Sequence, residues 1–279
     1  MLIKCWGTRG SIPVSGRQYI KYGGSTTCFE INTKDGELII IDAGSGIREL
    51  GIKVAENNHS KINLLLTHAH WDHIMGFPFF RPIYTPGTNI AVFGCSFTNN
   101  SIKEVLANTM TKPHFPVNFQ DIRATFTYNN VCDKIFQIGN ITVATIHLSH
   151  PNQGLSFKLT EDDKSFVFMT DNELTFRHIG GLDYNDYLEF IKGADILMHD
   201  SEYTQSDYTI KKAWGHSVYN DSLRLALESG VKQFGLIHHN QERSDDMIDE
   251  IVNDCKQIIN EHGSTLDCFA VYEGMEIEL

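Results

Sequence analysis

Residues 67–73, Thr-His-Ala-His-Trp-Asp-His, hold the densest set of metal-binding side chain types and directly follow three leucines typical of a buried strand. His68 and His70 are two residues apart, so in extended backbone both point the same way and can hold one cation. Asp72 and His73 are adjacent and can serve a second cation once the chain turns. Mixed nitrogen and oxygen donors suit zinc, and also manganese or iron. The spacing therefore predicts a metal site at the end of a buried strand.

The HxHxDH pattern of residues 68–73 resembles the defining element of the metallo-β-lactamase superfamily. The resemblance implies an α/β fold, a four-layer αββα sandwich of two mixed β-sheets flanked by helices, with the metals at one edge of the paired sheets. It also implies a hydrolase with two divalent metal ions, zinc first and manganese or iron as alternatives. The expected nucleophile is a hydroxide between the metals, because metal binding lowers the pKa of water toward ~7.

The resemblance also predicts three further ligands, each following a strand. His150 is preferred over His147 because a His-Pro before a glycine and a strand is the usual form in the family. Asp171 is expected to bridge the metals, with a turn or helix-capping role as the alternative. His238 is preferred over His239, which is expected to support a ligand or face substrate. The implied set is His68, His70, His150 and Asp171 for one metal, and Asp72, His73, Asp171 and His238 for the other.

Four further polar residues are candidates for supporting or catalytic roles. Asp42 ends an apolar strand, and the resemblance places it beside the HxHxDH loop, where it would orient a ligand imidazole. His199-Asp200 and Gly-His216-Ser resemble elements of the tRNA 3′-processing endonucleases. His199 with Asp200 is expected to relay a proton to the leaving group, and His216 to contact an anionic oxygen at a helix start. The catalytic candidates are thus His199, His216 and Asp72, and an ordinary structural role is the alternative for each residue outside the metal motif.

Two glycine-rich segments near the N-terminus, residues 6–13 and 22–28, resemble the phosphodiesterase-like members of the superfamily. These members include the class II cyclic-nucleotide phosphodiesterases and the cyclic-phosphate phosphodiesterases. The resemblance suggests that Ser25 or Thr27 lines the site. Arg9 is expected either to bind phosphate or to brace its loop.

The chain has 279 residues and a formal net charge of −12, which disfavours a protein that neutralises many phosphates along a nucleic acid. A nucleic acid partner is therefore not expected, whereas a small anionic substrate is compatible with this charge, because bound cations reverse the local potential. The six cysteines form no CxxC pair, and most are expected to be reduced core residues. No apolar run approaches the ~18 residues of a membrane span. We expect a cytoplasmic protein, and a homodimer on the resemblance alone.

Many strands come first along the chain, followed by alternating strands and helices, a pattern typical of two packed sheets with helices outside. Expected strands cover residues 2–6, 27–32, 37–41, 61–66, 90–93, 124–128, 134–138, 141–148, 156–159, 165–169, 194–199 and 233–237. Expected helices cover residues 47–56, 101–109, 184–192, 217–229 and 245–262. We find no linker and predict one domain, 1–279, with an insertion at about 80–130 that caps the site.

The leading functional hypothesis is hydrolysis of a small phosphodiester, with a cyclic nucleotide or related cyclic phosphate as the candidate substrate. It depends on the two N-terminal segments, on the Gly-His216-Ser element and on aspartate rather than cysteine at position 171. A tRNA 3′-processing endoribonuclease is the first alternative, and a lactone, thioester or β-lactam hydrolase the second. A non-catalytic metal-binding sensor is the alternative of another class.

Overall fold

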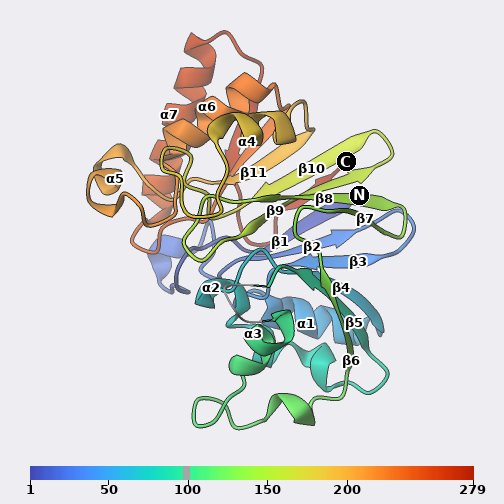
Figure 1. Ribbon diagram of the computed structural model, residues 1–279. Coiled ribbons are helices and arrows are strands. Elements are labelled where there is room, and N and C mark those ends of the chain that lie inside the picture. Colours follow the sequence, from blue (N-terminus) through green and yellow to red (C-terminus); the bar gives the residue numbers. More distant parts are fainter. Residues whose placement is uncertain (97–100) are drawn as a thin grey trace.

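Two seven-stranded β-sheets pack against each other, with helices on both outer faces (Figure 1). The computed structural model describes residues 1–96 and 101–279, so residues 97–100 of the expected insertion lie outside the described residues. This arrangement confirms the predicted αββα sandwich of two mixed sheets.

The first sheet has the strand order β14-β1-β2-β3-β4-β5-β6. Its strands are β1 (Leu2–Gly7), β2 (Cys28–Asn32), β3 (Leu38–Ile41), β4 (Lys61–Leu65), β5 (Asn89–Gly94), β6 (Thr125–Asn130) and β14 (Glu276–Glu278). Strands β3 to β6 run parallel, whereas β14, β1, β2 and β3 pair antiparallel. The parallel part carries the C-terminal ends of β3 and β4 to the same end of the sheet.

The second sheet has the order β13-β12-β11-β10-β9-β8-β7. Its strands are β7 (Ile135–Ile138), β8 (Ile141–His147), β9 (Leu155–Glu161), β10 (Lys164–Met169), β11 (Ile196–Asp200), β12 (Gln233–Ile237) and β13 (Asp267–Ala270). Strands β10 to β13 are parallel and the remaining pairs antiparallel. Three parallel strands, β10, β11 and β12, therefore end side by side.

Helices form the two outer layers. Figure 1 shows one group over the second sheet: α4 (Tyr184–Ile191), α6 (Tyr219–Ser229) and α7 (Asp245–Glu261). On the opposite side the first sheet is covered by α1 (Ile47–Glu56) and α3 (Ile102–Asn108). Two short helices, α2 (Trp71–Ile74) and α5 (Gln205–Lys211), and four 3₁₀ turns, η1 (Arg17–Tyr19), η2 (Phe77–Phe79), η3 (Arg81–Tyr84) and η4 (Phe119–Asp121), complete the described elements. Among the described residues, no helix combines the length and apolarity needed to cross a membrane.

Strand β10 shows why the sequence forms four layers. Its side chains alternate, so Phe166 and Phe168 enter the core between the sheets, while Val167 and Met169 enter the core beneath the helices. All four are buried, and the Phe168 ring lies 4.9 Å from that of Phe29 across the sheet interface. A strand that is apolar on both faces must be covered on both, as in parallel sheets of α/β proteins.

Most expected elements are present with ends shifted by one or two residues, but the prediction omitted β13, β14, α2 and α5. Strand β14 is short, carries glutamates at both ends and pairs only with β1, so its pairing rather than its composition makes it a strand. Helix α5 buries none of its residues, so its sequence needs no apolar face, and it has no apolar periodicity from which a helix could be predicted.

Cys95 and Cys132 are joined by a disulfide, with Cα atoms 5.3 Å apart. The sequence analysis did not predict this pair. The other four cysteines are buried and unpaired, as expected for small core residues.

Ile196 and Ile210 provide a matched test of this packing. Ile196 is fully buried between the sheets, whereas Ile210 in α5 is 82% exposed. We expect Ile196→Ala to lower the free energy of unfolding by about 2–5 kcal/mol. Ile210→Ala should change it by less than about 0.5 kcal/mol. Chemical denaturation measures both values, and similar losses would contradict the described packing.

Candidate functional site

The candidate site lies where strand ends from both sheets meet. Strand β4 leads into residues 67–73, and the last of these belong to α2. Strand β10 leads to Asp171, β11 ends at Asp200 and β12 leads to His238. Because β10, β11 and β12 are parallel neighbours, these three residues leave the second sheet at the same end. In Figure 1 this end lies on the side of α2.

Three site residues adopt a left-handed backbone conformation immediately after their strands. Asp42, Asp171 and His238 have φ angles of 60°, 48° and 60°. This region is unfavourable for residues with a Cβ and is found where surrounding structure enforces it, often at functional sites. After this turn each side chain contacts other residues of the site: Asp42 contacts His73, and Asp171 contacts His73 and His238.

The first group of donors consists of His68, His70, His150 and Asp171, whose ligand atoms all lie within 4.8 Å of one another. Nε2 of His68 lies 3.5 Å and Nε2 of His150 lies 3.6 Å from Oδ2 of Asp171. Nδ1 of His70 lies 2.9 Å from Nε2 of His150. These four residues are the set that the resemblance implied for one metal.

The second group consists of Asp72, His73 and His238, again within 4.8 Å of one another. Oδ1 of Asp171 faces this group, at 3.2 Å from Nε2 of His73 and 3.4 Å from Nε2 of His238. Oδ2 of Asp72 lies 3.1 Å from Nε2 of His238. The two oxygens of Asp171 are therefore turned toward different donor groups, as a bridging carboxylate requires.

Hydrogen bonds orient four of the imidazoles through Nδ1. His150 donates from Nδ1 to the carbonyl of Gly215 (2.8 Å), and His73 donates to Asp42 (2.7 Å). A ring that donates from Nδ1 in its neutral form keeps the lone pair of Nε2 for a metal. The other two Nδ1 contacts are His68 to the Thr67 hydroxyl (3.0 Å) and His238 to Glu202 (2.8 Å).

The donor set fits divalent cations. Nε2 of His68 and Nε2 of His73 are buried and have no hydrogen-bond partner among the described residues. Such orphaned nitrogens are costly unless a ligand satisfies them. Burial also lowers the pKa of His68 and His150 well below the ordinary value, which favours the neutral, metal-binding form.

The second group binds protons strongly when no cation is present. Burial opposes a charge on His73, but the carboxylates of Asp72, Asp171 and Asp42 outweigh it and raise its pKa well above the ordinary value. Burial likewise opposes a charge on His238, and Asp171 and Asp72 again raise the pKa. A cation entering this group would therefore displace protons.

Asp42 is connected by hydrogen bonds to both donor groups. It accepts hydrogen bonds from the Thr67 hydroxyl (2.7 Å) and backbone N–H (2.8 Å), in addition to the one from His73. Because the Thr67 hydroxyl donates to Asp42, it is left to accept from Nδ1 of His68. One buried carboxylate thus orients one imidazole of each group.

Asp200 pairs with His216 and not with the imidazole of His199. Nδ1 of His216 donates to Asp200 Oδ2 (2.9 Å), whereas Nδ1 of His199 donates to the backbone carbonyl of Asp200 (2.6 Å). The expected proton relay from His199 through Asp200 is therefore not supported by this geometry. Burial opposes a charge on His216, but Glu202 and Asp200 raise its pKa to about 9. His216 lies beside the donor cluster, with Nδ1 4.0 Å from Asp171.

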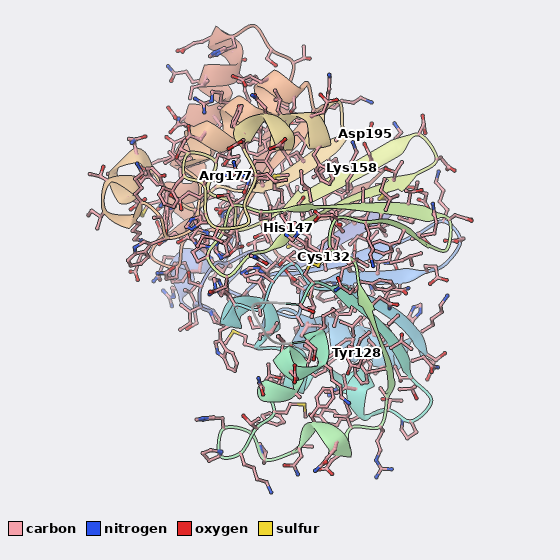
Figure 2. The ribbon with its side chains drawn as sticks, viewed as in Figure 1. Tyr128, Cys132, His147, Lys158, Arg177 and Asp195 are labelled. Carbon is pink, nitrogen blue, oxygen red and sulfur yellow. A yellow bond between two sulfur atoms is a disulfide. The ribbon has the colours of Figure 1, made fainter. Side chains whose placement is uncertain are left out.

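His147, the alternative to His150, faces a different segment. Its Nε2 lies 3.2 Å from the carboxylate of Asp133. Figure 2 shows it beside the chain around Cys132. It forms no part of either donor group.

The remaining candidates lie near the cluster but make structural contacts. Arg9 is fully buried and donates to the carbonyls of Gly23 (2.8 Å) and Arg243 (2.8 Å), which favours bracing over phosphate binding. The Ser25 carbonyl accepts from the backbone N–H of Arg9 (3.0 Å). His239 donates from Nε2 to the carbonyl of Val271 (2.9 Å), so its expected substrate-facing role has no support in this geometry.

Glu173 is a buried residue that the sequence analysis missed. Its carboxylate accepts from the backbone N–H groups of Ala213 (2.8 Å) and Gly215 (2.7 Å), and from Tyr208 (2.7 Å) and His178 (2.8 Å). It thereby fixes the loop whose Gly215 carbonyl orients His150.

Glu202, in contact with His238, was also missed. Glu173 and Glu202 each lie two residues after a candidate acid, Asp171 and Asp200 respectively. Because the backbone turns at Asp171 (φ 48°), this spacing does not place the side chains on one side, and no local pattern indicated either glutamate.

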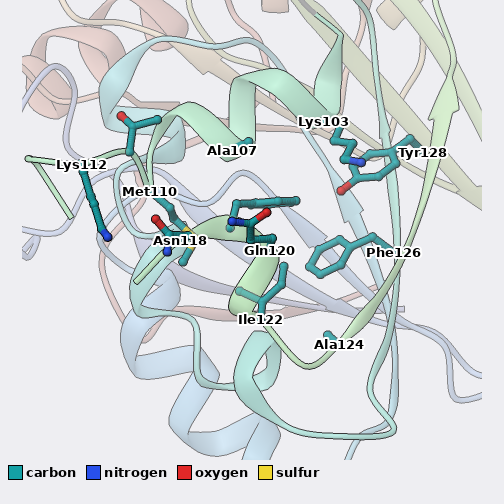
Figure 3. Close-up of a pocket in the computed structure, with 12 residues that line it drawn as sticks. Lys103, Ala107, Met110, Lys112, Asn118, Gln120, Ile122, Ala124, Phe126 and Tyr128 are labelled. Carbon is teal, nitrogen blue, oxygen red and sulfur yellow. The ribbon is translucent and has the colours of Figure 1, made fainter. Parts of the chain in front are cut away.

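A separate cavity of about 780 Å³ lies within the expected insertion (Figure 3). It is lined by Lys103, Ala107, Met110, Thr111, Lys112, Asn118, Phe119, Gln120, Ile122, Ala124, Phe126 and Tyr128. None of the candidate site residues contributes to it. The capping role of residues 80–130 stays a prediction.

Known proteins resemble this chain over nearly its whole length. Ribonuclease Z of Picrophilus torridus is 23% identical, over 91% of this chain and 90% of that protein. Yeast PDE1 in its unliganded form superposes with a TM-score of 0.72 and 14% identity, covering 100% of this chain and 99% of that one. A diphosphatase from the PhnP family gives a TM-score of 0.69 and 16% identity, over 100% and 97%. At these identities the structural similarities establish a shared fold.

The sequence itself identifies the family. Residues 38–239, which include every candidate metal ligand, match the family described as "Beta-lactamase superfamily domain". This match spans more than half of the chain and agrees with the αββα fold and the HxHxDH segment. The chain is therefore a member of the beta-lactamase superfamily.

Proposed function

We propose that this protein is a metal-dependent hydrolase that cleaves phosphodiesters with two divalent cations. One observation carries the proposal: four imidazoles, each with Nδ1 occupied by a hydrogen bond, direct Nε2 to within 3.6 Å of the carboxylate of Asp171. Nε2 of His68 in the first group and Nε2 of His73 in the second are left without a hydrogen-bond partner among the described residues. A pair of cations is the ligand that satisfies them.

The proposed ligands are the two donor groups already described. The first cation would be held by His68, His70, His150 and Asp171, and the second by Asp72, His73, Asp171 and His238. Zinc is the preferred metal for this donor set, with manganese and iron as alternatives. Bound divalent cations of this kind stabilise charge on a phosphoryl oxygen and make hydroxide available at neutral pH.

The chain's own residues would orient the ligands and handle the proton. Asp42 and the Gly215 carbonyl hold imidazoles in the metal-binding tautomer. His216, held by Asp200, is the proposed acid that protonates the leaving oxygen. This assignment replaces His199 as the candidate acid. Asp72 remains a ligand candidate, whose Oδ2 also accepts from the Ser11 backbone N–H (2.8 Å).

Small phosphodiesters are the preferred substrate class. The N-terminal segments that resemble phosphodiesterase-like members and the net charge of −12 support this choice. A shared fold with a diphosphatase is consistent with chemistry on phosphate groups.

A ribonuclease acting on RNA 3′ ends is a second candidate. The similarity to a ribonuclease Z over most of both chains favours it. The expectation that nucleic acid is an unlikely partner thus has only the overall charge behind it.

Removal of the metals should abolish activity. We expect the zinc- or manganese-loaded protein to hydrolyse bis-p-nitrophenyl phosphate and a chelator to stop the reaction until metal is restored. His68→Ala and Asp171→Ala should each lower kcat/KM by more than about 100-fold, beyond the loss typical of residues that only contact a ligand. His59→Ala, at an exposed histidine, is the control. Protein that holds metal yet turns over no phosphodiester would refute the proposal and favour the sensor alternative.

The role of His216 can be separated by the choice of leaving group. His216→Asn should lower kcat for a cyclic nucleotide by about 10²–10⁴-fold, the usual contribution of a general acid. For bis-p-nitrophenyl phosphate the loss should be much smaller, because p-nitrophenolate leaves without a proton. Steady-state kinetics on both substrates checks this, and equal losses would argue against a leaving-group acid.

Comparison of kcat/KM for two classes of substrate distinguishes the two candidate functions. We expect a higher kcat/KM for small cyclic phosphodiesters than for precursor tRNA carrying a 3′ extension. Asp171→Asn, purified identically, controls for contaminating nucleases. Efficient, site-specific cleavage of the precursor with weak turnover of the small substrates would establish the ribonuclease instead.

A further inference from the structure

We propose that Glu202 is a positioning residue for the second cation and acts by fixing the orientation of His238. The inference rests on the proposed two-metal site and adds to it a carboxylate that belongs to neither donor group. It assigns Glu202 to the same task for His238 that Asp42 performs for His73.

The contact between the two side chains is buried and direct. Oε2 of Glu202 lies 2.8 Å from Nδ1 of His238, and the two side chains are 3% and 1% exposed. Oε1 of Glu202 accepts a hydrogen bond from the Asn240 amide at 2.7 Å. Both carboxylate oxygens are thus engaged, and only one of them faces the imidazole.

This contact decides which nitrogen of His238 is free. The Glu202 carboxylate can only accept, so Nδ1 must carry the proton. Nε2 lies within hydrogen-bond distance of Oδ2 of Asp72 (3.1 Å) and 3.4 Å from Oδ1 of Asp171, and in the neutral ring its lone pair would be available to a cation held between these oxygens. Loss of Glu202 would release this constraint and let the ring change tautomer.

The rest of the pocket leaves the imidazole of His238 little freedom. Its ring stacks on His216 with centroids 4.7 Å apart, and faces His73 at 5.6 Å. On another side Gly10 approaches so closely that an added Cβ would overlap the ring. Packing therefore fixes the plane of the ring, while the hydrogen bond to Glu202 determines which nitrogen meets the metal.

The backbone N–H and carbonyl of Glu202 are both held by hydrogen bonds to side chains. Its N–H donates to Oδ1 of Asp200 at 3.0 Å, and its carbonyl accepts from the Arg243 guanidinium at 3.0 Å. Oδ2 of Asp200 meanwhile holds His216. Asp200 thus hydrogen-bonds the proposed proton donor and Glu202 hydrogen-bonds the proposed ligand, while Oε2 of Glu202 also lies 3.5 Å from Nδ1 of His216.

Metal binding tests the assignment without measuring activity. Cobalt(II) or zinc affinities of the full chain are measured by competition with a chromophoric chelator, and cobalt(II) absorption reports the geometry of each site. Glu202→Ala should weaken the second equivalent of metal by about 10–100-fold, as expected for loss of a residue that orients a ligand, and leave the first unchanged. Glu202→Gln keeps a neutral acceptor and should recover most of the affinity.

Glu161 supplies the matched control. It is also a buried glutamate, but it contacts the Lys34 backbone (2.8 Å) and the amino group of Met1 (2.7 Å) rather than a candidate ligand. Glu161→Ala should lower thermal stability and leave both metal affinities unchanged. Folding of every variant is checked by circular dichroism before metal is added.

The outcomes separate this inference from the function on which it rests. If His238→Ala loses the second equivalent and folded Glu202→Ala keeps it at wild-type affinity, the role of Glu202 is refuted and the metal site stands. If the wild-type protein binds fewer than two equivalents, or His238→Ala still binds two, the two-metal assignment itself fails.

Discussion

The buried carboxylate of Asp171 imposes the constraint on which the rest of the site depends. It is 2% exposed and has imidazole nitrogens on both sides, so neither its charge nor theirs can be stabilised by water. Burying such groups is costly unless each is paired or bound to a metal. The surrounding residues form hydrogen bonds to every outward-facing Nδ1 of the four imidazoles around Asp171, and the inward Nε2 atoms lie within 3.6 Å of its carboxylate.

The αββα sandwich holds the site residues in position. Strands buried on both faces give a rigid support, and parallel neighbours β10, β11 and β12 deliver their C-terminal residues to one place. Asp42, Asp171 and His238 then turn through left-handed backbone conformations at the strand ends. These turns place all three side chains in the cluster around Asp171.

The sequence allowed the αββα fold to be predicted, and also which seven side chains come together in the two donor groups, because the HxHxDH spacing is local and the later residues each follow an apolar strand. Their role as metal ligands stays a prediction. The sequence did not reveal that Asp200 contacts His216 while the imidazole of His199 does not contact the Asp200 carboxylate. Adjacent strand residues point to opposite faces, and the sequence alone does not say which face meets the site. It also missed Glu173, whose partners include backbone groups 40 and 42 residues away. The Cys95–Cys132 disulfide joins positions 37 residues apart without a motif, and β14 exists only by pairing with β1. Contacts between distant segments carry no local pattern, so these features required the structure.

Anomalous diffraction from crystals of the metal-loaded protein would test the central claim most directly. Data collected on both sides of the absorption edge of the bound metal locate each ion and identify its element. A two-metal site would give two peaks on opposite sides of Asp171, one among His68, His70 and His150 and the other among Asp72, His73 and His238. A single peak, or density between these side chains that shows no anomalous signal at saturating metal, would contradict it.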